Sequence, residues 1–302
     1  MKSERNKTIV LTGDEEGRLL SLCTPLDKLG EDIRNTVIHG DSLTAMPLLP
    51  RAFADLIICD PPYNLTKDYN GELFTKMRTE EYEAFTVAWL EKAAPLLKKT
   101  GSIYVCCDWR SSLVIGRVLA DYFTVRNRIT WQREKGRGAA ANWKNSMEDI
   151  WFATASDSYT FNLNDVKIRR RVTAPYTNQG VPKDWEKTAE GNFRNTCPSN
   201  FWDDITVPFW SMSENTEHPA QKPEKLAARL ILASSDPGDM VFDPFAGSGT
   251  SAAAAKKLGR DYCVIERNGG YCALTQKRLA LAQEDSTIQG YKNGVFTQRN
   301  SR

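Results

Sequence analysis

The chain has 302 residues, of which 41% are hydrophobic, so it can build one large α/β domain with an insertion or two modest domains. Its net charge of +2 is too small to attract the whole molecule to a polyanion, so any nucleic-acid surface must be a local patch. Seven cysteines without a CxxC pair and only two histidines argue against a metal site, and we expect none. Because no run is long and apolar enough for a signal or a bilayer, we expect a cytoplasmic protein without a membrane partner.

The first half of the chain alternates between expected strands and helices. Residues 1–34 mix charged and leucine-rich stretches, and we predict only an appended arm or helix there. Expected strands lie near 36–40 and at 54–59, 102–107 and 125–131. Expected helices begin after residue 41, run from 79 to a glycine stop at 101, and cover 111–122. This alternation predicts right-handed crossovers and a doubly wound, mainly parallel α/β sheet.

The pattern changes after residue 131. A basic loop at 133–139 leads into an expected strand at 148–153, and periodicity is lost between 156 and 215. Basic residues alternate there with aromatic ones, which suits a surface for phosphates and bases. The plainer alternative is an irregular insertion whose aromatic rings form a small core of their own, and both can hold.

Regular structure resumes at His218. The remaining elements are expected to be helices at 224–234, 251–258 and 270–283 and strands ending at Asp243 and Glu266. We therefore divide the chain into an N-terminal arm (1–34), a catalytic half (35–155), an insertion (156–215), a cofactor-binding half (216–285) and a flexible tail (286–302).

The stretch Asp60-Pro61-Pro62-Tyr63 closes the buried strand expected at 54–59. Two prolines fix the backbone and remove two N–H donors, so the carbonyls of Asp60 and Pro61 become rigid acceptors. Ligands bind at the carboxyl ends of strands in an open α/β sheet, which favours a reaction centre here. An ordinary Pro-Pro turn with Tyr63 in a packing role is the alternative.

A second acidic strand end, Asp243, precedes a glycine loop. Gly247, Gly249 and Ala252 match the pattern G-x-G-x-x-G/A between a strand and a helix, which predicts a nucleotide-type ligand at the helix N-terminus. Glu266 follows the glycine loop at the end of the next strand, which is about the spacing at which an acidic residue binds ribose hydroxyls in nucleotide-binding folds. Because Asp243 would repel a pyrophosphate and attract an ammonium group, we expect an adenosine-containing ligand that carries a cation.

Four stretches together resemble β-class S-adenosylmethionine-dependent DNA amino-methyltransferases: DPPY (60–63), DPFAGSGT (243–250), HPAQKP (218–223) and HGDSL (39–43). The order of DPPY before the glycine loop is that of the circularly permuted members. The resemblance implies a Rossmann-like methyltransferase fold with a target-recognition insertion, S-adenosylmethionine as cofactor and double-stranded DNA as partner. It also allows a homodimer and a cognate restriction endonuclease. The Asp that opens DPPY favours adenine N6 over cytosine N4.

The resemblance also assigns roles to residues. Catalysis is assigned to Asp60, Pro61, Pro62 and Tyr63, with the Asp60 carboxylate and the Pro61 carbonyl accepting from the target amine and Tyr63 stacking on a flipped base. Cofactor contacts are expected from Asp41, Ser42, Asp60, Lys222, Asp243, Phe245, Ala246, Gly247, Ser248, Gly249, Thr250, Glu266 and Arg267. Lys222 is assigned to the methionyl carboxylate, with a solvated lysine as the alternative, and Asp41 could equally be only a helix cap. Expected DNA contacts are Arg133, Lys135, Arg137, Arg169, Arg170 and Arg171.

Other enzyme classes explain fewer of these features. A cytosine-N4 methyltransferase is one alternative, although many of these enzymes have SPPY in place of DPPY. A methyltransferase of RNA or of protein amides shares the glycine loop and a related Pro-Pro-Tyr motif, but usually places the loop first. A nicotinamide dehydrogenase or an inert nucleotide-binding module explains only the glycines.

Overall fold

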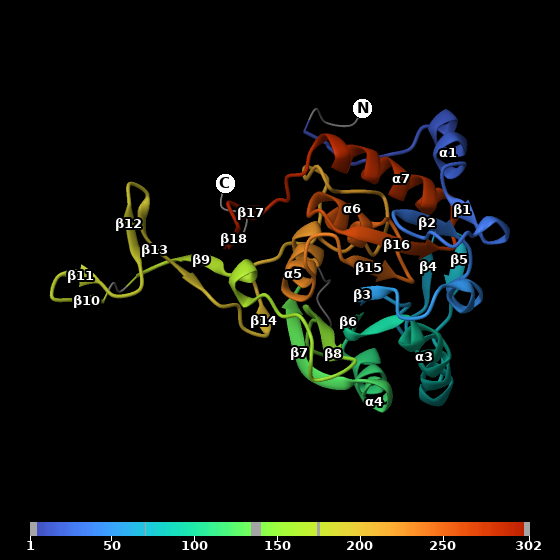
Figure 1. The fold of residues 1–302 in the computed structure, drawn as a ribbon, viewed down its shortest axis with the longest axis horizontal. Coiled ribbons are helices and arrows are strands. Elements are labelled where there is room, and N and C mark those ends of the chain that lie inside the picture. Colours follow the sequence, from blue (N-terminus) through green and yellow to red (C-terminus); the bar gives the residue numbers. More distant parts are fainter. Residues whose placement is uncertain (1–4, 70, 134–139, 174–175, 299–302) are drawn as a thin grey trace.

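A computed structural model describes residues 5–69, 71–133, 140–173 and 176–298. At its centre lies a nine-stranded sheet in the order β1-β2-β16-β15-β3-β6-β8-β7-β14 (Figure 1). In chain order its strands are β1 (Thr24–Pro25), β2 (Thr36–His39), β3 (Ala54–Cys59), β6 (Leu97–Cys107), β7 (Thr124–Gln132), β8 (Met147–Thr154), β14 (Phe201–Trp202), β15 (Met240–Asp243) and β16 (Asp261–Glu266). All neighbouring pairs are parallel except those that β8 makes with β6 and β7. The prediction of a doubly wound, mainly parallel sheet is confirmed.

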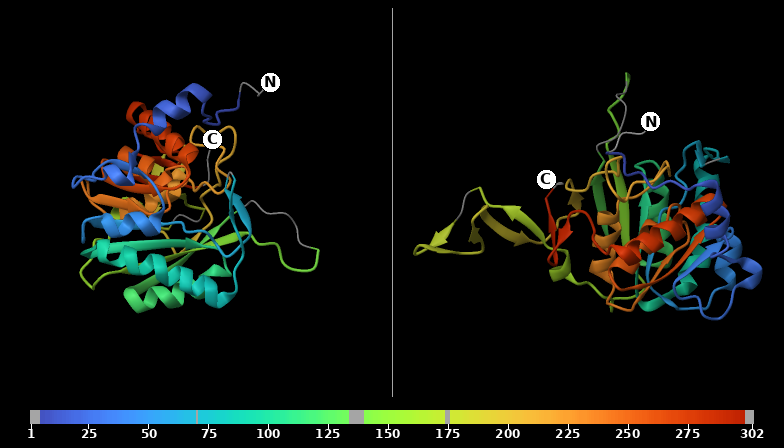
Figure 2. Two further views of the ribbon diagram at one scale, coloured as in Figure 1. Left: turned by 90° about the vertical axis from the view of Figure 1, so that its right-hand side faces the viewer. Right: turned by 90° about the horizontal axis from the view of Figure 1, so that it is seen from above.

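Helices cover both faces of this sheet (Figure 2). Helices α2 (Ser42–Ala45), α3 (Thr79–Ala93) and α4 (Ser111–Tyr122) contribute to one buried cluster, whose largest side chain is Trp89. Helices α5 (Glu224–Ser234), α6 (Thr250–Lys257) and α7 (Gly269–Glu284) contribute to the other. Burial of apolar surface on both faces explains why the central strands are almost continuously hydrophobic.

The order of the sheet brings two distant strand ends together. β15 lies beside β3, with Phe242 paired with Ile57, so the ends that carry Asp243 and Asp60 share one edge. A short hairpin, β4 (Lys67–Tyr69) and β5 (Glu72–Phe74), follows β3 at the same edge. The register of the sheet therefore places both acidic strand ends around one region.

The helix that begins at Thr79 is shorter than expected. It ends at Ala93, and Lys98 and Lys99 lie in strand β6, so the predicted stop at Gly101 is wrong. Pro95 is the physical reason, because a proline inside a helix removes a donor and clashes with the preceding turn. The chain passes through a short 3₁₀ turn at 94–96 and enters the sheet, where Lys98 Nζ lies 2.7 Å from an Asp55 oxygen on neighbouring β3.

The stretch 156–215 is more regular than expected, because much of it forms β-strands. Strands β9 (Ile168–Arg171), β10 (Thr177–Asn178), β11 (Val181–Pro182), β12 (Glu186–Thr188) and β13 (Gly191–Thr196) make up what we call the β-arm. The β-arm extends away from the body, with β10 and β11 at its far end (Figure 1). β13 pairs antiparallel with both β9 and β12, so a twisted ribbon replaces the predicted irregular segment.

The predicted flexible tail is wrong for residues 286–298. Strands β17 (Tyr291–Lys292) and β18 (Val295–Thr297) form a hairpin, and β18 pairs in parallel with β9 at the root of the β-arm. Phe296 is fully buried, with its ring 4.7 Å from both the Tyr291 ring and the Arg229 guanidinium. Burial of this ring orders the segment. The Asn293-Gly294 pair, both at positive φ, is a hairpin signal in the sequence.

The N-terminal segment is also packed onto the body. Helix α1 (Gly13–Leu20) lies against α7, Leu19 is buried, and Glu15 pairs with Lys277 at 2.7 Å. The described part of this segment therefore contains a helix that packs on the body of the protein. None of the described helices combines the length and the apolar character that crossing a bilayer requires.

Candidate active site

A cavity of about 440 Å³ opens at the carboxyl ends of β2, β3, β15 and β16. The size is that of a typical small-ligand site. Every residue that the sequence assigned to catalysis or to the cofactor lines this cavity except Gly249: Asp41, Ser42, Asp60, Pro61, Pro62, Tyr63, Lys222, Asp243, Phe245, Ala246, Gly247, Ser248, Thr250, Glu266 and Arg267. The topology of the sheet gathers these residues from four separate parts of the chain.

The glycine loop between β15 and α6 turns within very little space. Gly247 and Gly249 have φ of 54° and 73°, which side chains disfavour. A Cβ on Gly249 would lie 2.4 Å from Thr275 Cγ2, and one on Gly247 would lie 3.0 Å from the His218 ring. The Gly247 N–H donates to Glu266 Oε2 at 2.8 Å, so the loop and the acid at the end of β16 hold each other.

His218 supports the same loop as a neutral ring. Its imidazole packs edge-on against Tyr271, with ring centroids 4.4 Å apart, and its Nδ1 accepts from the Ala220 N–H at 3.3 Å. Burial, together with the nearby cations of Lys67 and Lys222, lowers the pKa of His218 to about 3. The ring therefore packs beneath Gly247 without adding positive charge to the cavity.

Asp243 is a buried carboxyl at the end of β15. Its oxygens accept from the Phe245 N–H at 2.9 Å and from Ser251 Oγ at 2.5 Å. Burial raises the pKa of Asp243 to about 7 despite those two donors, and the negative charges of Asp60 and Glu266 add to the rise. A cation in the cavity would stabilise the charged form, so the site is suited to a positively charged ligand.

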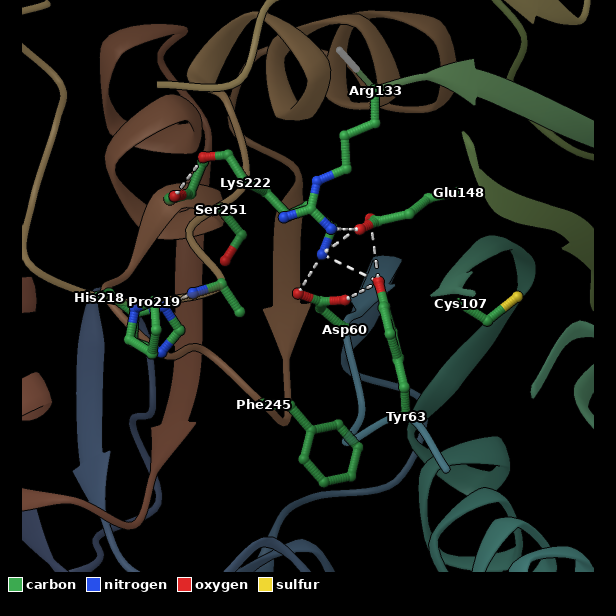
Figure 3. Close-up of polar contacts among 12 residues, drawn as sticks. Asp60, Tyr63, Cys107, Arg133, Glu148, His218, Pro219, Lys222, Phe245 and Ser251 are labelled. Carbon is green, nitrogen blue, oxygen red and sulfur yellow. Dashed lines mark hydrogen bonds and ion pairs between the residues drawn. The ribbon is translucent and has the colours of Figure 1, made fainter. Parts of the chain in front are cut away.

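The side chains around Asp60 form a dense polar cluster (Figure 3). Asp60 Oδ1 accepts from the Tyr63 hydroxyl at 2.8 Å, and Oδ2 lies 2.6 Å from Lys222 Nζ. Lys222 Nζ is also 3.0 Å from the Tyr63 hydroxyl and 3.4 Å from Glu148 Oε2, and Glu148 Oε1 is paired with Arg133. We call these five residues the charge cluster. It contains two carboxylates and two cations and is neutral overall.

Burial and charge within the cluster act in opposite directions on Lys222. Burial alone would lower the pKa of this ammonium, but Asp60 and Glu148 outweigh it and raise the pKa well above its usual value. Burial also raises the pKa of the Tyr63 hydroxyl well above 10, with further contributions from the same two carboxylates. Lys222 therefore stays positively charged, and the Tyr63 hydroxyl keeps its proton and can donate it in a hydrogen bond. The structure places Lys222 against Asp60, and its assignment to a cofactor carboxylate stays a prediction.

Glu148 was not among the residues assigned from the sequence. It is only 3% exposed and lies at the beginning of β8. Because β8 runs antiparallel, its beginning shares an edge with the carboxyl ends of β3 and β6, and Asp149 pairs with Cys107 there. A strand assumed to be parallel would have placed Glu148 at the opposite edge. The sequence signal for Glu148 was the presence of two acidic residues, Glu148 and Asp149, at the start of an otherwise apolar strand.

Asp41 serves as the N-cap of α2. Its Oδ1 accepts from the backbone N–H groups of Leu43 at 3.0 Å and Thr44 at 3.2 Å. Ser42 Oγ donates to the Pro244 carbonyl and so links α2 to the glycine loop. The helix-cap alternative for Asp41 is therefore realised, and the same side chain also lines the cavity.

The expected DNA contacts lie in two places. Arg133 is at the end of β7 on the cavity wall, while Lys135 and Arg137 lie outside the described residues. Arg169, Arg170 and Arg171 lie on β9 in the β-arm. Arg169 pairs with Glu186 and lies over the Phe193 ring, 4.8 Å from its centroid, so it already has partners within the arm.

The raised pKa of Asp243 predicts how stability depends on pH. The unfolded carboxyl ionises near 3.8 and the folded one near 7, so the folded protein holds the proton more tightly and its free energy of unfolding falls as pH rises between these values. Asp243→Asn should make this fall between pH 5 and pH 8 shallower, as measured by urea unfolding without ligand. Glu214, whose pKa burial also raises to about 7, should supply much of the remaining slope. An unchanged slope in both Asp243→Asn and Glu214→Gln would contradict these shifts.

Comparisons with known proteins identify the family of the chain. The family model described as DNA methylase matches residues 54–277. The chain is 32% identical to the DNA adenine methyltransferase YhdJ of Escherichia coli K12 over 285 residues, covering 92% of this chain and 94% of that protein. It is 33% identical to the type II methyltransferase M.HpaI of Haemophilus parainfluenzae over 260 residues, covering 84% and 76% of the two chains.

The fold is likewise similar to solved structures. The crystal structure of the M1.HpyAVI–SAM complex superposes with a TM-score of 0.51 at 21% identity, covering 80% of this chain and 98% of that one. At this identity the likeness concerns the fold alone. The matched family, which covers β3 to α7, shows that the chain belongs to the DNA methylases that modify exocyclic amines.

Proposed function

We propose that this chain transfers a methyl group to N6 of adenine in double-stranded DNA, with S-adenosylmethionine as the donor. The observation that carries the proposal is the pairing of β3 with β15, which places the acidic ends Asp60 and Asp243 on one cavity. YhdJ, a relative that covers nearly the whole chain, is named as an adenine enzyme. The leading Asp of DPPY favours adenine over the cytosine-N4 alternative.

The cavity fits S-adenosylmethionine on the chemistry of its walls. Asp243 and Glu266 provide carboxylates for a ligand that carries cationic and hydroxyl groups, and the glycine loop permits close approach. The residues that would hold the cofactor are Asp41, Ser42, Asp243, Phe245, Ala246, Gly247, Ser248, Gly249, Thr250, Glu266 and Arg267. When bound, the cofactor supplies a methyl group on a sulfonium, which is a good leaving group.

The chain's own contribution to the transfer is mainly positional. The Asp60 carboxylate would accept a hydrogen bond from one N–H of the target amine and stabilise the positive charge that develops on its nitrogen. The backbone of the motif is fixed from behind, because the Tyr82 hydroxyl donates to the Pro62 carbonyl at 3.0 Å. The Pro61 carbonyl would accept a hydrogen bond from the other N–H of the amine.

Tyr63 would provide the stacking surface for the flipped base. Stacking worth about 1–3 kcal/mol offsets much of the cost of unstacking the adenine from the duplex. The ring is held by its hydroxyl, which donates to Asp60, so it is oriented before a base arrives. Preorganisation of this kind lowers the cost of assembling the site.

The β-arm is proposed as the part that grips the duplex. Arg169, Arg170 and Arg171 lie along β9, and Tyr176 near the far end is 77% exposed. Basic side chains beside exposed rings suit phosphates and bases. A cytoplasmic location, a homodimer and a cognate restriction endonuclease stay predictions.

Replacing Asp60 tests the assigned chemistry. Asp60→Ala should abolish methyl transfer from labelled S-adenosylmethionine to DNA while the protein stays folded, because the carboxylate acts on the amine and is not part of the apolar core. The transferred label is counted in purified DNA, and the melting temperature controls for folding. Near-normal turnover in this variant would refute the role of Asp60.

The basic stretch on β9 has its own test. Changing Arg169, Arg170 and Arg171 together to Ala should weaken binding to all DNA sequences alike and make the plot of log K against log salt shallower, by up to about three neutralised charges. Because Arg169 is already paired with Glu186, we expect the change to be nearer two. Fluorescence anisotropy over a salt series measures the slope, and an unchanged slope would show that the stretch is a solvated face.

A further inference from the structure

Both carboxylate oxygens of Asp60 are already occupied in this structure. The Tyr63 hydroxyl donates to Oδ1 at 2.8 Å, and Lys222 Nζ lies 2.6 Å from Oδ2. A target amine needs one of these oxygens, and its nitrogen gains positive charge as the methyl group arrives. An ammonium fixed on the same carboxylate would oppose that charge. Movement of Lys222 away from Asp60 would remove this opposition and leave the oxygen open to the amine.

Glu148 is the neighbouring group able to receive the ammonium. Its Oε2 lies 3.4 Å from Lys222 Nζ and 3.2 Å from the Tyr63 hydroxyl. The side chain is buried on β8. In the order of the sheet, β8 and β15 lie on opposite sides of β3, so Glu148 approaches Asp60 from the direction opposite to Asp243. A small shift of Nζ exchanges one buried carboxylate partner for another. The ammonium keeps a carboxylate partner throughout the move, and Asp60 keeps the Tyr63 hydroxyl as a donor, which limits the cost of separating the two charges.

Arg133 connects Glu148 with the protein surface. It is paired with Glu148 Oε1, its side chain is 33% exposed against 4% for Glu148, and it lies at the end of β7 on the cavity wall. While Arg133 stays, the charge of Glu148 is shared between two cations. If Arg133 turns to a phosphate, the attraction of Glu148 for Lys222 increases, because one competing cation has gone.

We propose that Glu148 is a positioning residue for methyl transfer: it takes Lys222 away from Asp60 when the duplex engages Arg133, and so frees Asp60 to accept the target amine. The inference rests on the proposed function. It replaces the assignment of Lys222 to the cofactor with a role as the counter-ion of Asp60 in the base-free state. It also gives Arg133 a second role beyond holding DNA, since its departure prepares the site.

A double-mutant cycle of Glu148→Gln and Lys222→Met tests the inference. The single-turnover rate of methyl transfer is measured at saturating DNA and S-adenosylmethionine, and cofactor affinity is measured separately by calorimetry. Glu148→Gln alone should lower the rate by about tenfold or more, because Lys222 then stays on Asp60. Lys222→Met should retain measurable transfer, because Asp60 can then accept the target amine without first giving up the ammonium. Added to Lys222→Met, Glu148→Gln should cause little further loss.

Three results would overturn the inference. Equal losses from Glu148→Gln with and without Lys222 would show that Glu148 acts independently of the ammonium. Loss of cofactor binding in Lys222→Met would make Lys222 a cofactor ligand, and loss of all measurable transfer with binding intact would make its ammonium part of the chemical step. A wild-type protein that transfers no methyl group to DNA would instead refute the proposed function.

Matched variants control for folding. Asp149→Asn neutralises the adjacent buried carboxyl on β8, which accepts from Thr130 Oγ1 at 3.0 Å and lies outside the charge cluster. It should keep the parental rate, and its melting temperature gives the cost of neutralising an acid on this strand. Glu148→Asp keeps the charge with a shorter reach and should retain more of the rate than Glu148→Gln. If Glu148→Gln does not fold, Glu148→Asp enters the same cycle and must show the same dependence on Lys222.

Discussion

The site depends on one constraint: two acidic strand ends meet at one edge of a sheet that is buried on both faces. β3 and β15 pair in parallel, so Asp60 and Asp243 face the same cavity, and Glu266 follows on the next strand. Burying a charged carboxylate costs free energy unless a cation lies close to it. Asp243 responds with a raised pKa, while Asp60 is compensated by Lys222. Both features suit a reaction in which a cationic donor enters and positive charge passes to an amine.

The single antiparallel strand of the core completes this arrangement. β8 brings Glu148 to the carboxyl edge, and β7 brings Arg133 beside it. Two carboxylates and two cations then balance around the Tyr63 hydroxyl, and the ammonium of Lys222 has two partners within reach. Such a neutral cluster can exchange partners at small cost, whereas an isolated buried charge could not move. Under the role proposed for Arg133, the same arrangement would connect a bound DNA phosphate to Asp60 through Glu148 and Lys222.

Much of the fold and most of the cavity could be predicted, because strong local signals coincide with the tertiary contacts. Apolar strands ending in Asp60 and Asp243, and glycines in tight space, were sufficient to locate the residues that line this cavity. The sequence did not show what depends on long-range pairing. The direction of β8, and hence the place of Glu148, follows from its partners in the sheet. The C-terminal hairpin is ordered by packing against β9 and α5. Local sequence patterns do not reveal contacts between such distant segments, although Asn293-Gly294 marks the turn of the hairpin.

The most direct measurement of the central claim is mass spectrometry of nucleosides from duplex DNA incubated with the protein and S-adenosylmethionine. An account built on Asp60 and the DPPY backbone predicts N6-methyladenine in DNA treated with the wild-type protein and none in DNA treated with Asp60→Ala. N4-methylcytosine in its place would contradict the adenine assignment. If no methylated base formed in DNA while labelled methyl groups appeared in RNA or protein, the substrate class itself would be wrong.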